Sequence, residues 1–392
     1  MVPIPFEMRE YERRLRAVRD SMEARGIDLL IVTDVANQHY LTAYDGWSFY
    51  TPQIVAVSIE DEEPVWIGRA MDAAGGRLTA WMKPENVIGF PETYVQRTDR
   101  HPMDWIAQWI HQRGWSRRRI GIEMEAYYYS AKAHERLVAG LPDARISDAS
   151  LLVNWVRSVK SPGEIDYLRK AARLAECAVR AAYDIIEPGI RECDAVAAIQ
   201  AAQVSGLPDV AGDITALPAT ILGGENASAP HITWSDRRFG AGETIALELA
   251  GVCRRYTAGL ARTLQLGVMP PKVAETAKAV IEGMDAVLNE VRPGSTGELV
   301  EAAWRRVITR YGLNKESRIG YSIGLAYPPD WGEHTISLRP GDNHILEPGN
   351  VLHCILGMWM EGWGLEISET ILVTEVGCET LTKFPREVFV KV

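Results

Sequence analysis

A helix start near the middle of the chain divides the sequence into two parts with different patterns. Residues 161–164 read Ser-Pro-Gly-Glu, which is a capping box with proline at the first helical position. Apolar residues then recur at helical spacing over 165–175. A chain of 392 residues is long enough for two domains. We therefore expect a boundary near Lys160, with one domain over 1–158 and a second over 159–392.

The first part alternates helical patterns with short apolar strands. Apolar residues recur at helical spacing over 8–22, Gly26 ends this helix, and 28–33 reads as a buried strand. Further strands are expected at 53–58, 64–68 and 119–123, and further helices at 103–113 and 130–139. This alternation predicts an α/β layer domain.

The second part combines longer helices with longer strands. Helical patterns cover 273–291 and 297–311, and apolar strands are expected at 244–249, 351–356 and 365–374. Long helices thus alternate with strands in this part of the sequence.

Composition narrows the classes of protein to which the chain can belong. With 47% hydrophobic and 24% charged residues it has the make-up of a globular protein, and a net charge of -10 argues against nucleic acid or an anionic membrane as a partner. Five cysteines without CxxC or CxC spacing favour reduced thiols. The first residues lack the apolar core of a signal peptide, and no apolar run reaches membrane-spanning length. We expect a cytoplasmic protein with no nucleic-acid and no membrane partner.

Motifs of the second part resemble those of the family that contains creatinase, prolidase, aminopeptidase P and methionine aminopeptidase. The matching segments are 224–226, 230–231, 242–248, 256–263, 320–324, 347–349 and 368–374. The resemblance implies an α/β N-terminal creatinase-like domain followed by an α+β pita-bread catalytic domain.

The metal positions of that family carry unsuitable residues in this chain. In metal-dependent members, two Asp, one His and two Glu hold a pair of divalent ions. These positions fall on Glu248, Gly259, Tyr321, Ile355 and Ser368. Gly, Ile and Ser supply no anionic ligand atom, and Tyr is a poor ligand for such ions. We therefore expect no metal and no other cofactor.

Two residues are candidates for metal-free chemistry. His231 matches a family histidine that stands beside the metal centre and is the acid/base of creatinase, whereas outside the motif it would read as an ordinary loop histidine. Glu248 interrupts the apolar strand 245–250, and a carboxylate there is costly unless it is paired. It is either a structural partner of an arginine such as Arg262 or a nucleophile or base that works with His231.

A closer resemblance covers nearly the whole chain. Segments 44–50, 101–104, 229–234, 327–333 and 364–367 look like those of the ectoine hydrolases, metal-free members of the same family. The stretch 257–261 departs from their pattern, and creatinase residues that recognise creatine are absent at Ala261, Tyr321 and Ile355. The resemblance implies hydrolytic opening of the cyclic amidine ectoine to N-acetyl-2,4-diaminobutyrate.

Such a substrate needs a cation for its carboxylate and acidic or aromatic groups for its amidinium. Arg339 resembles the arginine that meets the substrate carboxylate in creatinase, and its planar fork suits that task. The aromatic and acidic candidates for the remaining contacts are Tyr321, Trp47, Tyr50, Trp331, Trp359, Trp363, Glu333 and Glu366.

The family resemblance also implies a homodimer, in which the N-terminal domain of one subunit covers the active site of the other. The aromatic loop 44–50, with Trp47 and Tyr50, is suited to that role. Three other functions are left open by the sequence: a creatinase-like enzyme for another small zwitterion, a binding protein without catalysis, and a metal-dependent Xaa-Pro peptidase.

Overall fold

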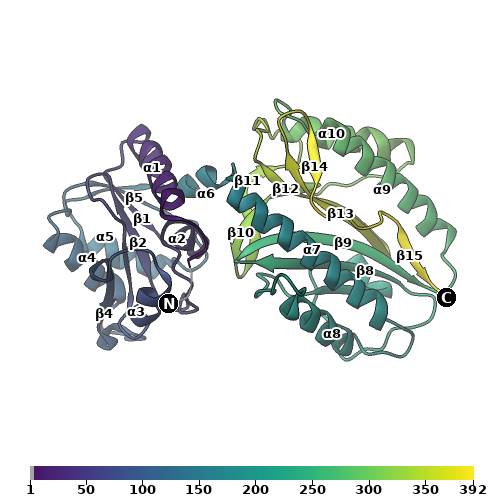
Figure 1. Cartoon of the computed structure of the whole chain (residues 1–392), viewed down its shortest axis with the longest axis horizontal. Helices are drawn as coiled ribbons and strands as arrows, with labels where there is room; N and C mark the ends of the chain where they lie inside the picture. The colour runs from purple at the N-terminus through teal and green to yellow at the C-terminus, as the bar shows by residue number, and fades with distance from the viewer. Residues whose placement is uncertain (1–3) are drawn as a thin grey trace. The chain divides into compact units, whose positions relative to one another are not determined.

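The computed structural model describes residues 4–392, which form two units, one ending at Val156 and the other spanning Arg157–Val392 (Figure 1). The first unit contains a six-stranded sheet in the order β4-β3-β2-β1-β5-β6. Its strands are β1 (Leu29–Val32), β2 (Ile54–Ser58), β3 (Val65–Arg69), β4 (Val87–Phe90), β5 (Arg119–Ile122) and β6 (Arg145–Asp148).

The helices within residues 4–157 accompany this first sheet. They are α1 (Met8–Ala24), α2 (Val35–Thr42), α3 (Ala73–Thr79), α4 (Pro102–Gln112), α5 (Ala131–Gly140) and α6 (Leu152–Arg157). Ile106 and Ile110 of α4 and Leu137 of α5 pack against Ile31 and Ile120 of the sheet in one buried cluster. The expected α/β layer domain is confirmed.

The second unit contains a nine-stranded sheet with the path β14-β13-β12-β10-β9-β8-β7, from which β11 branches at β10 and β15 at β9. Its strands are β7 (Thr220–Gly223), β8 (Thr244–Cys253), β9 (Tyr256–Leu266), β10 (Gly320–Tyr327), β11 (Asp330–Ser337), β12 (Val351–Met360), β13 (Trp363–Val373), β14 (Cys378–Thr380) and β15 (Val388–Lys391). Its helices are α7 (Pro162–Ile185), α8 (Glu192–Ser205), α9 (Pro271–Glu290) and α10 (Gly297–Arg310).

The start of α7 follows from its capping box. Ser161 Oγ accepts a hydrogen bond from the backbone N–H of Glu164, and the Glu164 carboxylate accepts one from the backbone N–H of Ser161. α7 crosses one face of β8 and β9 (Figure 1), and its apolar side joins Ala195 and Ile199 of α8 in a buried cluster over Leu247 and Leu249. This packing leaves the opposite face of β8 free for other side chains.

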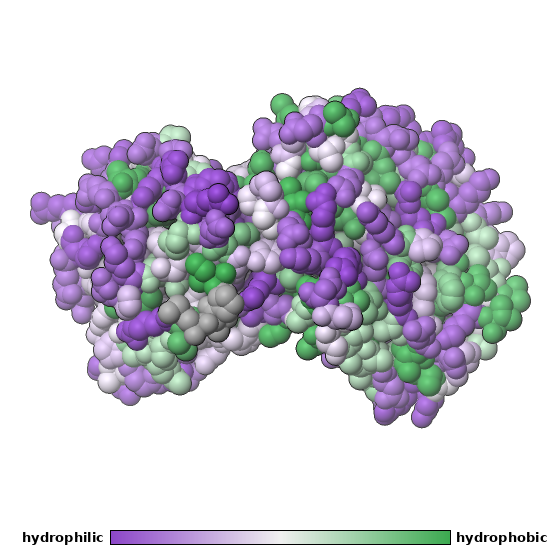
Figure 2. Space-filling view, viewed as in Figure 1, coloured by the Kyte–Doolittle hydropathy of each residue, from purple (hydrophilic) through white to green (hydrophobic). Residues whose placement is uncertain are grey.

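On the face of the molecule in Figure 2, hydrophilic residues predominate in both units and hydrophobic residues form only small patches. Among residues 4–392, no helix is both long enough and apolar enough to cross a lipid bilayer.

Candidate active site

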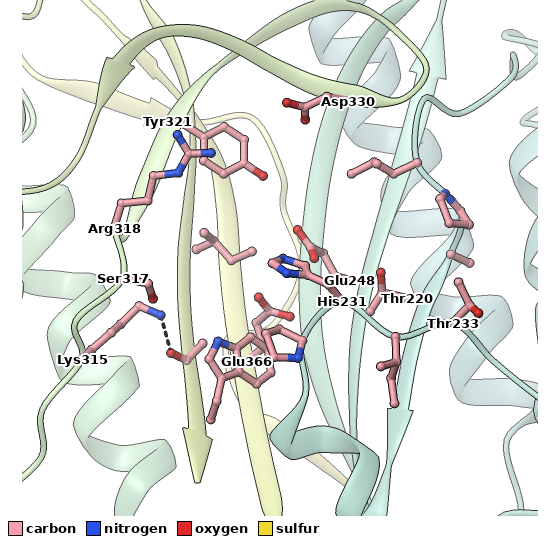
Figure 3. Close-up of a pocket in the computed structure, with 18 residues that line it drawn as sticks. Thr220, His231, Thr233, Glu248, Lys315, Ser317, Arg318, Tyr321, Asp330 and Glu366 are labelled. Atoms are coloured by element: carbon pink, nitrogen blue, oxygen red, sulfur yellow. Dashed lines mark hydrogen bonds between the residues drawn. The ribbon is translucent and has the colours of Figure 1, made fainter. Parts of the chain in front are cut away.

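The face of the second sheet opposite α7 carries a cavity of about 500 Å³ (Figure 3). Its polar walls combine acidic and basic side chains in one small space, and its apolar walls include Ile355 and Trp359. The ionisable or hydroxyl-bearing residues that line it are Thr220, His231, Thr233, Glu248, Lys315, Ser317, Arg318, Tyr321, Asp330 and Glu366. A cavity of this size with a few converging polar groups is typical of a small-molecule site.

Glu248 reaches the cavity because side chains alternate along β8. Leu247 and Leu249 point to the core beneath α7, so Glu248 points to the opposite face, where its register partner on β7 is Thr220. Ala246, two residues earlier, packs against Trp359 on this same face. The apolar strand therefore delivers one carboxylate into the cavity.

Glu248 is not the structural partner of an arginine. Arg262 donates instead to Glu369 at 2.8 Å and to the carbonyl oxygens of Ser368 and Phe384. Within residues 4–392, no hydrogen bond to the Glu248 carboxylate holds that side chain in place. Burial, and then the negative charge of Asp330, raise the pKa of Glu248 to about 7.

Glu366 is a second carboxylate in the same cavity. It lies on β13, is 1% exposed, and its Oε1 has no hydrogen-bond partner among the described residues. Burial, followed by the charge of Glu248, raises the pKa of Glu366 well above its usual range. Two carboxylates that lack partners are an unsatisfied site for a cation.

Two cations line the cavity from the segment before β10. Lys315 Nζ donates to the carbonyl oxygen of Gly357 at 2.7 Å (Figure 3), and burial lowers its pKa, against the opposing effect of Glu366. The Arg318 guanidinium lies 4.3 Å from the ring centre of Tyr321. The cavity thus holds both charges that a zwitterion requires.

His231 enters from the segment after the short helix η3 (Gly224–Ser228). Its side chain is exposed to the cavity, and its ring and the Glu248 carboxylate both point into that cavity in Figure 3. The structure therefore places the two sequence-predicted catalytic residues, His231 and Glu248, in one cavity with Tyr321, Trp359 and Glu366.

The side chains at the family's metal positions do not fit a metal pair. Gly259 and Ile355 offer no ligand atom, and Ser368 Oγ already accepts the backbone N–H of Ala261 at 2.6 Å. The ring of His353 fills the room beside Gly259, since a Cβ added there would lie 2.7 Å from its Cε1. Residues 4–392 contain no group of three His, Cys, Asp or Glu side chains placed to bind a metal ion.

Gly259→Ala should lower the free energy of unfolding by about 1–3 kcal/mol, because the new methyl group would overlap the His353 ring. Urea unfolding measures this change. Gly377→Ala is the matched control, since a Cβ at Gly377 meets no atom within 4 Å. Equal unfolding midpoints for the two variants would contradict the close contact of His353 with Gly259.

Several sequence-predicted binding residues lie elsewhere. Arg339 is exposed and does not line the cavity. Glu333 is buried in ion pairs with Lys160 at 2.5 Å and Arg157 at 3.7 Å, so its charge is already compensated. The expectation that Arg339 and Glu333 line the site is therefore wrong. The cations that line the cavity are Arg318 and Lys315.

The aromatic candidates also divide into residues that line the cavity and residues that lie elsewhere. Trp359 lines the cavity, whereas Trp331 lies behind its wall and donates from Nε1 to the Tyr321 hydroxyl at 2.7 Å. The Lys272 ammonium lies 5.0 Å from the ring centre of Trp363. Trp47 and Tyr50 belong to the first unit, where they are 46% and 65% exposed.

Sequence reasoning missed Lys315, Arg318, Asp330 and His353. Lys315 and Arg318 occur in a polar segment before β10 that has no distinctive pattern. Asp330 lies in segment 327–333, which resembles the ectoine hydrolases. It is the acidic residue that directly follows two prolines. His353 interrupts an apolar strand just as Glu248 does, and that interruption was the available signal.

Comparisons with known proteins identify the families that the two parts of the chain match. The family described as Metallopeptidase family M24 matches residues 166–375, and the Creatinase/Prolidase N-terminal domain matches residues 14–159. The chain is 45% identical to an ectoine hydrolase of Halomonas elongata, over 100% of this chain and 99% of the relative. It is 42% identical to an uncharacterized hydrolase/peptidase of Sinorhizobium fredii, over 98% of each chain.

Solved structures share the fold at low sequence identity. A prolidase from Pyrococcus horikoshii matches with a TM-score of 0.80 and 20% identity, over 96% of this chain and 100% of its own. A prolidase from Thermococcus sibiricus matches with a TM-score of 0.84 and 18% identity, over 98% of this chain and 100% of its own. The expected fold, an α/β creatinase-like domain followed by a pita-bread domain, is confirmed, and the chain belongs to metallopeptidase family M24.

Proposed function

We propose that the protein is a metal-independent hydrolase that opens the cyclic amidine ring of ectoine, giving N-acetyl-2,4-diaminobutyrate. The observation that carries this proposal is the charge pattern of the cavity. Among the described residues, no hydrogen bond reaches the Glu248 carboxylate or Glu366 Oε1, and Lys315 and Arg318 line the same space. The similarity to an ectoine hydrolase over the whole chain supports the same substrate.

The cavity groups match the two charges of ectoine. Glu248 and Glu366 bind the amidinium, whose positive charge lowers their raised pKa values and ionises them. Lys315 and Arg318 bind the ring carboxylate, and the aromatic surface of Trp359 offers a face for the amidinium. Binding in this orientation brings the amidine carbon to Glu248.

Ring opening then follows from the positions of Glu248 and His231. A Glu248 oxygen attacks the amidine carbon, and protonated His231 gives its proton to the departing ring nitrogen, so that one C–N bond breaks. Neutral His231 next takes a proton from water as the water adds to the Glu248 carbonyl carbon of the acyl imidate, so that the acetamide is the leaving group. Collapse of this adduct releases the acetamide product and restores the Glu248 carboxylate.

General-base catalysis by Glu248 is the competing mechanism for the same residues. The carboxylate would then take a proton from water, which attacks the amidine carbon directly. This path forms no bond between Glu248 and the substrate. The two mechanisms predict the same product and differ in the presence of a covalent adduct.

A substrate panel followed by proton NMR tests the proposed function. Ectoine should be converted to N-acetyl-2,4-diaminobutyrate, whereas creatine and an Xaa-Pro dipeptide should remain intact. Hydrolysis of creatine in place of ectoine would support an amidinohydrolase for another zwitterion. Tight binding of ectoine without turnover would support a binding protein.

We also propose that the protein is a homodimer in which loop 44–50 of one subunit completes the cavity of the other. In this loop Tyr44 and Phe49 are buried, whereas Trp47 and Tyr50 expose large aromatic surfaces. Exposed aromatic residues of this size are common at interfaces.

Mixed dimers test this arrangement. A Trp47→Ala/Tyr50→Ala variant and a His231→Ala variant should each be nearly inactive, and their heterodimers should regain up to about half of the activity per mixed dimer, because one intact site is rebuilt. Homodimers of each variant, treated in the same way, are the controls. Verified heterodimers that stay inactive would contradict the shared site.

A further inference from the structure

A buried chain of hydrogen bonds leads from the sheet to the cavity at Tyr321. The backbone N–H of Ala261 donates to Ser368 Oγ at 2.6 Å, and Ser368 Oγ lies 2.8 Å from His353 Nε2. His353 Nδ1 lies 3.4 Å from the Tyr321 hydroxyl, which also accepts the indole N–H of Trp331 at 2.7 Å. Of these side chains, Tyr321 alone lines the cavity.

The direction of each bond follows from counting donors and acceptors. Ser368 Oγ is fully buried and accepts from Ala261, and within residues 4–392 its own proton has no other acceptor than His353 Nε2. Nε2 must then lack a proton, so the neutral ring carries its proton on Nδ1. Burial lowers the pKa of His353 to about 3, which keeps the ring neutral.

The same count of donors and acceptors fixes the direction of the Tyr321 hydroxyl proton. Its oxygen accepts the N–H of Trp331 at 2.7 Å and the Nδ1–H of His353 over a longer 3.4 Å. Both lone pairs are then used, and the hydroxyl proton is left to point into the cavity. Burial, with a further contribution from the Glu248 charge, raises the pKa of Tyr321, so it stays a phenol that can donate.

We propose that His353 is a positioning residue that aims the Tyr321 hydroxyl proton at an amidine nitrogen of the substrate while Glu248 attacks the amidine carbon. This inference rests on the proposed function. During attack the amidine nitrogens gain electron density, and a fixed donor beside them stabilises the adduct more than the bound substrate. The imidazole takes up the space beside Gly259.

Ser368 and His353 do not form a separate pair of nucleophile and base that reacts with the substrate. Ser368 is fully buried, and its oxygen is occupied by the backbone N–H of Ala261. His353 is also fully buried and does not line the cavity. A substrate cannot reach either side chain, so their effect must pass through Tyr321.

Nitrogen-15 NMR of the histidine rings tests the tautomer without substrate. A His353→Asn sample identifies the His353 signals by their loss. We expect a proton on Nδ1 and none on Nε2 from about pH 5 to 9, because the ring is buried and neutral. A proton on Nε2, or a titration within that range, would overturn the inference whether or not the protein hydrolyses ectoine.

Kinetics of the variants test the path through Tyr321. Tyr321→Phe should lower kcat for ectoine by about 10²-fold with a small change in KM, because a donor to the adduct is lost. His353→Phe should lower kcat by roughly tenfold, and His353→Asn, whose amide N–H can replace Nδ1–H, should recover part of it. The double variant His353→Phe/Tyr321→Phe should be no slower than Tyr321→Phe.

Additive losses in that double variant would show that His353 acts independently of Tyr321 and would overturn the inference. Equal kcat values for His353→Asn and His353→Phe would also overturn it. A wild-type protein that does not turn over ectoine would instead refute the proposed function, and the tautomer measurement would then decide the hydrogen-bond chain by itself.

Discussion

Glu248→Gln should lower kcat for ectoine by about 10³ to 10⁵-fold while ectoine binding stays within about tenfold. Glutamine keeps the size and polarity of the side chain, but it can neither attack the amidine carbon nor take a proton from water. Glu366→Gln is the matched control, since it makes the same change in the same cavity and should raise KM more than it lowers kcat. Stopped-flow kinetics and calorimetric binding separate the two effects, and equal kcat losses would argue against a distinct role for Glu248.

The pH dependence of kcat/KM follows from the raised pKa of Glu248, which is about 7. Glu248 must be ionised to react, so kcat/KM should rise with pH through about 7 and fall in acid, because this ratio reports the free enzyme. A profile with no inflection near neutral pH, measured with ectoine in buffers of constant ionic strength, would contradict this assignment.

Stability should change in the opposite direction with pH. Because the folded pKa of Glu248 lies above the unfolded value, the folded protein holds this proton more tightly. The resulting stability is present in acid and is lost as the pH rises through about 7. Glu248→Gln should therefore raise the free energy of unfolding at alkaline pH by roughly 1–3 kcal/mol, although it abolishes activity.

His231→Ala should lower turnover by about 10² to 10⁴-fold, because neither the leaving nitrogen nor the attacking water then has a proton donor or acceptor. If Glu248 is the nucleophile, the slower second step lets an adduct accumulate. Intact-protein mass spectrometry should then show this variant with the mass of one ectoine added, since ring opening expels no fragment. His101→Ala, at a helix cap of the first unit, is the control for loss of a histidine.

The state of the adduct distinguishes the two mechanisms. Peptide mapping should place the added mass on the peptide that contains Glu248, and the adduct should be absent from Glu248→Gln/His231→Ala. Single turnover in oxygen-18 water adds a second measurement, because label in the Glu248 carboxylate requires a covalent bond to substrate. Absence of both the adduct and this label would leave Glu248 as a general base.

Much of the fold could be predicted from local sequence patterns. The capping box at 161–164 and the apolar face that follows specified the start of α7, since both act within a few residues. The strands β9 and β10 were not among the predicted elements. β9 is buried throughout and contains Gly259 and Arg262, so it lacks the alternation that marks a strand with one exposed face.

The candidate site was predicted where a side chain contradicted its surroundings. Glu248 in an apolar strand and His231 in a family motif were identifiable, and the structure brings them into one cavity. Arg339 and Glu333 were chosen by residue type within conspicuous segments, but one is exposed and the other is neutralised by Lys160. Which charged residues converge depends on strand register and on long-range pairing, and neither can be read from neighbouring residues.

Ectoine turnover by chelator-treated enzyme tests the central claim most directly. The purified protein, dialysed against excess chelator, should hold no stoichiometric divalent ion by elemental analysis, and NMR should show ring opening of ectoine at the untreated rate. Added zinc, manganese or cobalt should not increase this rate. Loss of turnover on chelation with recovery on metal addition, or about one tightly bound ion per subunit, would contradict a metal-independent reaction at Glu248.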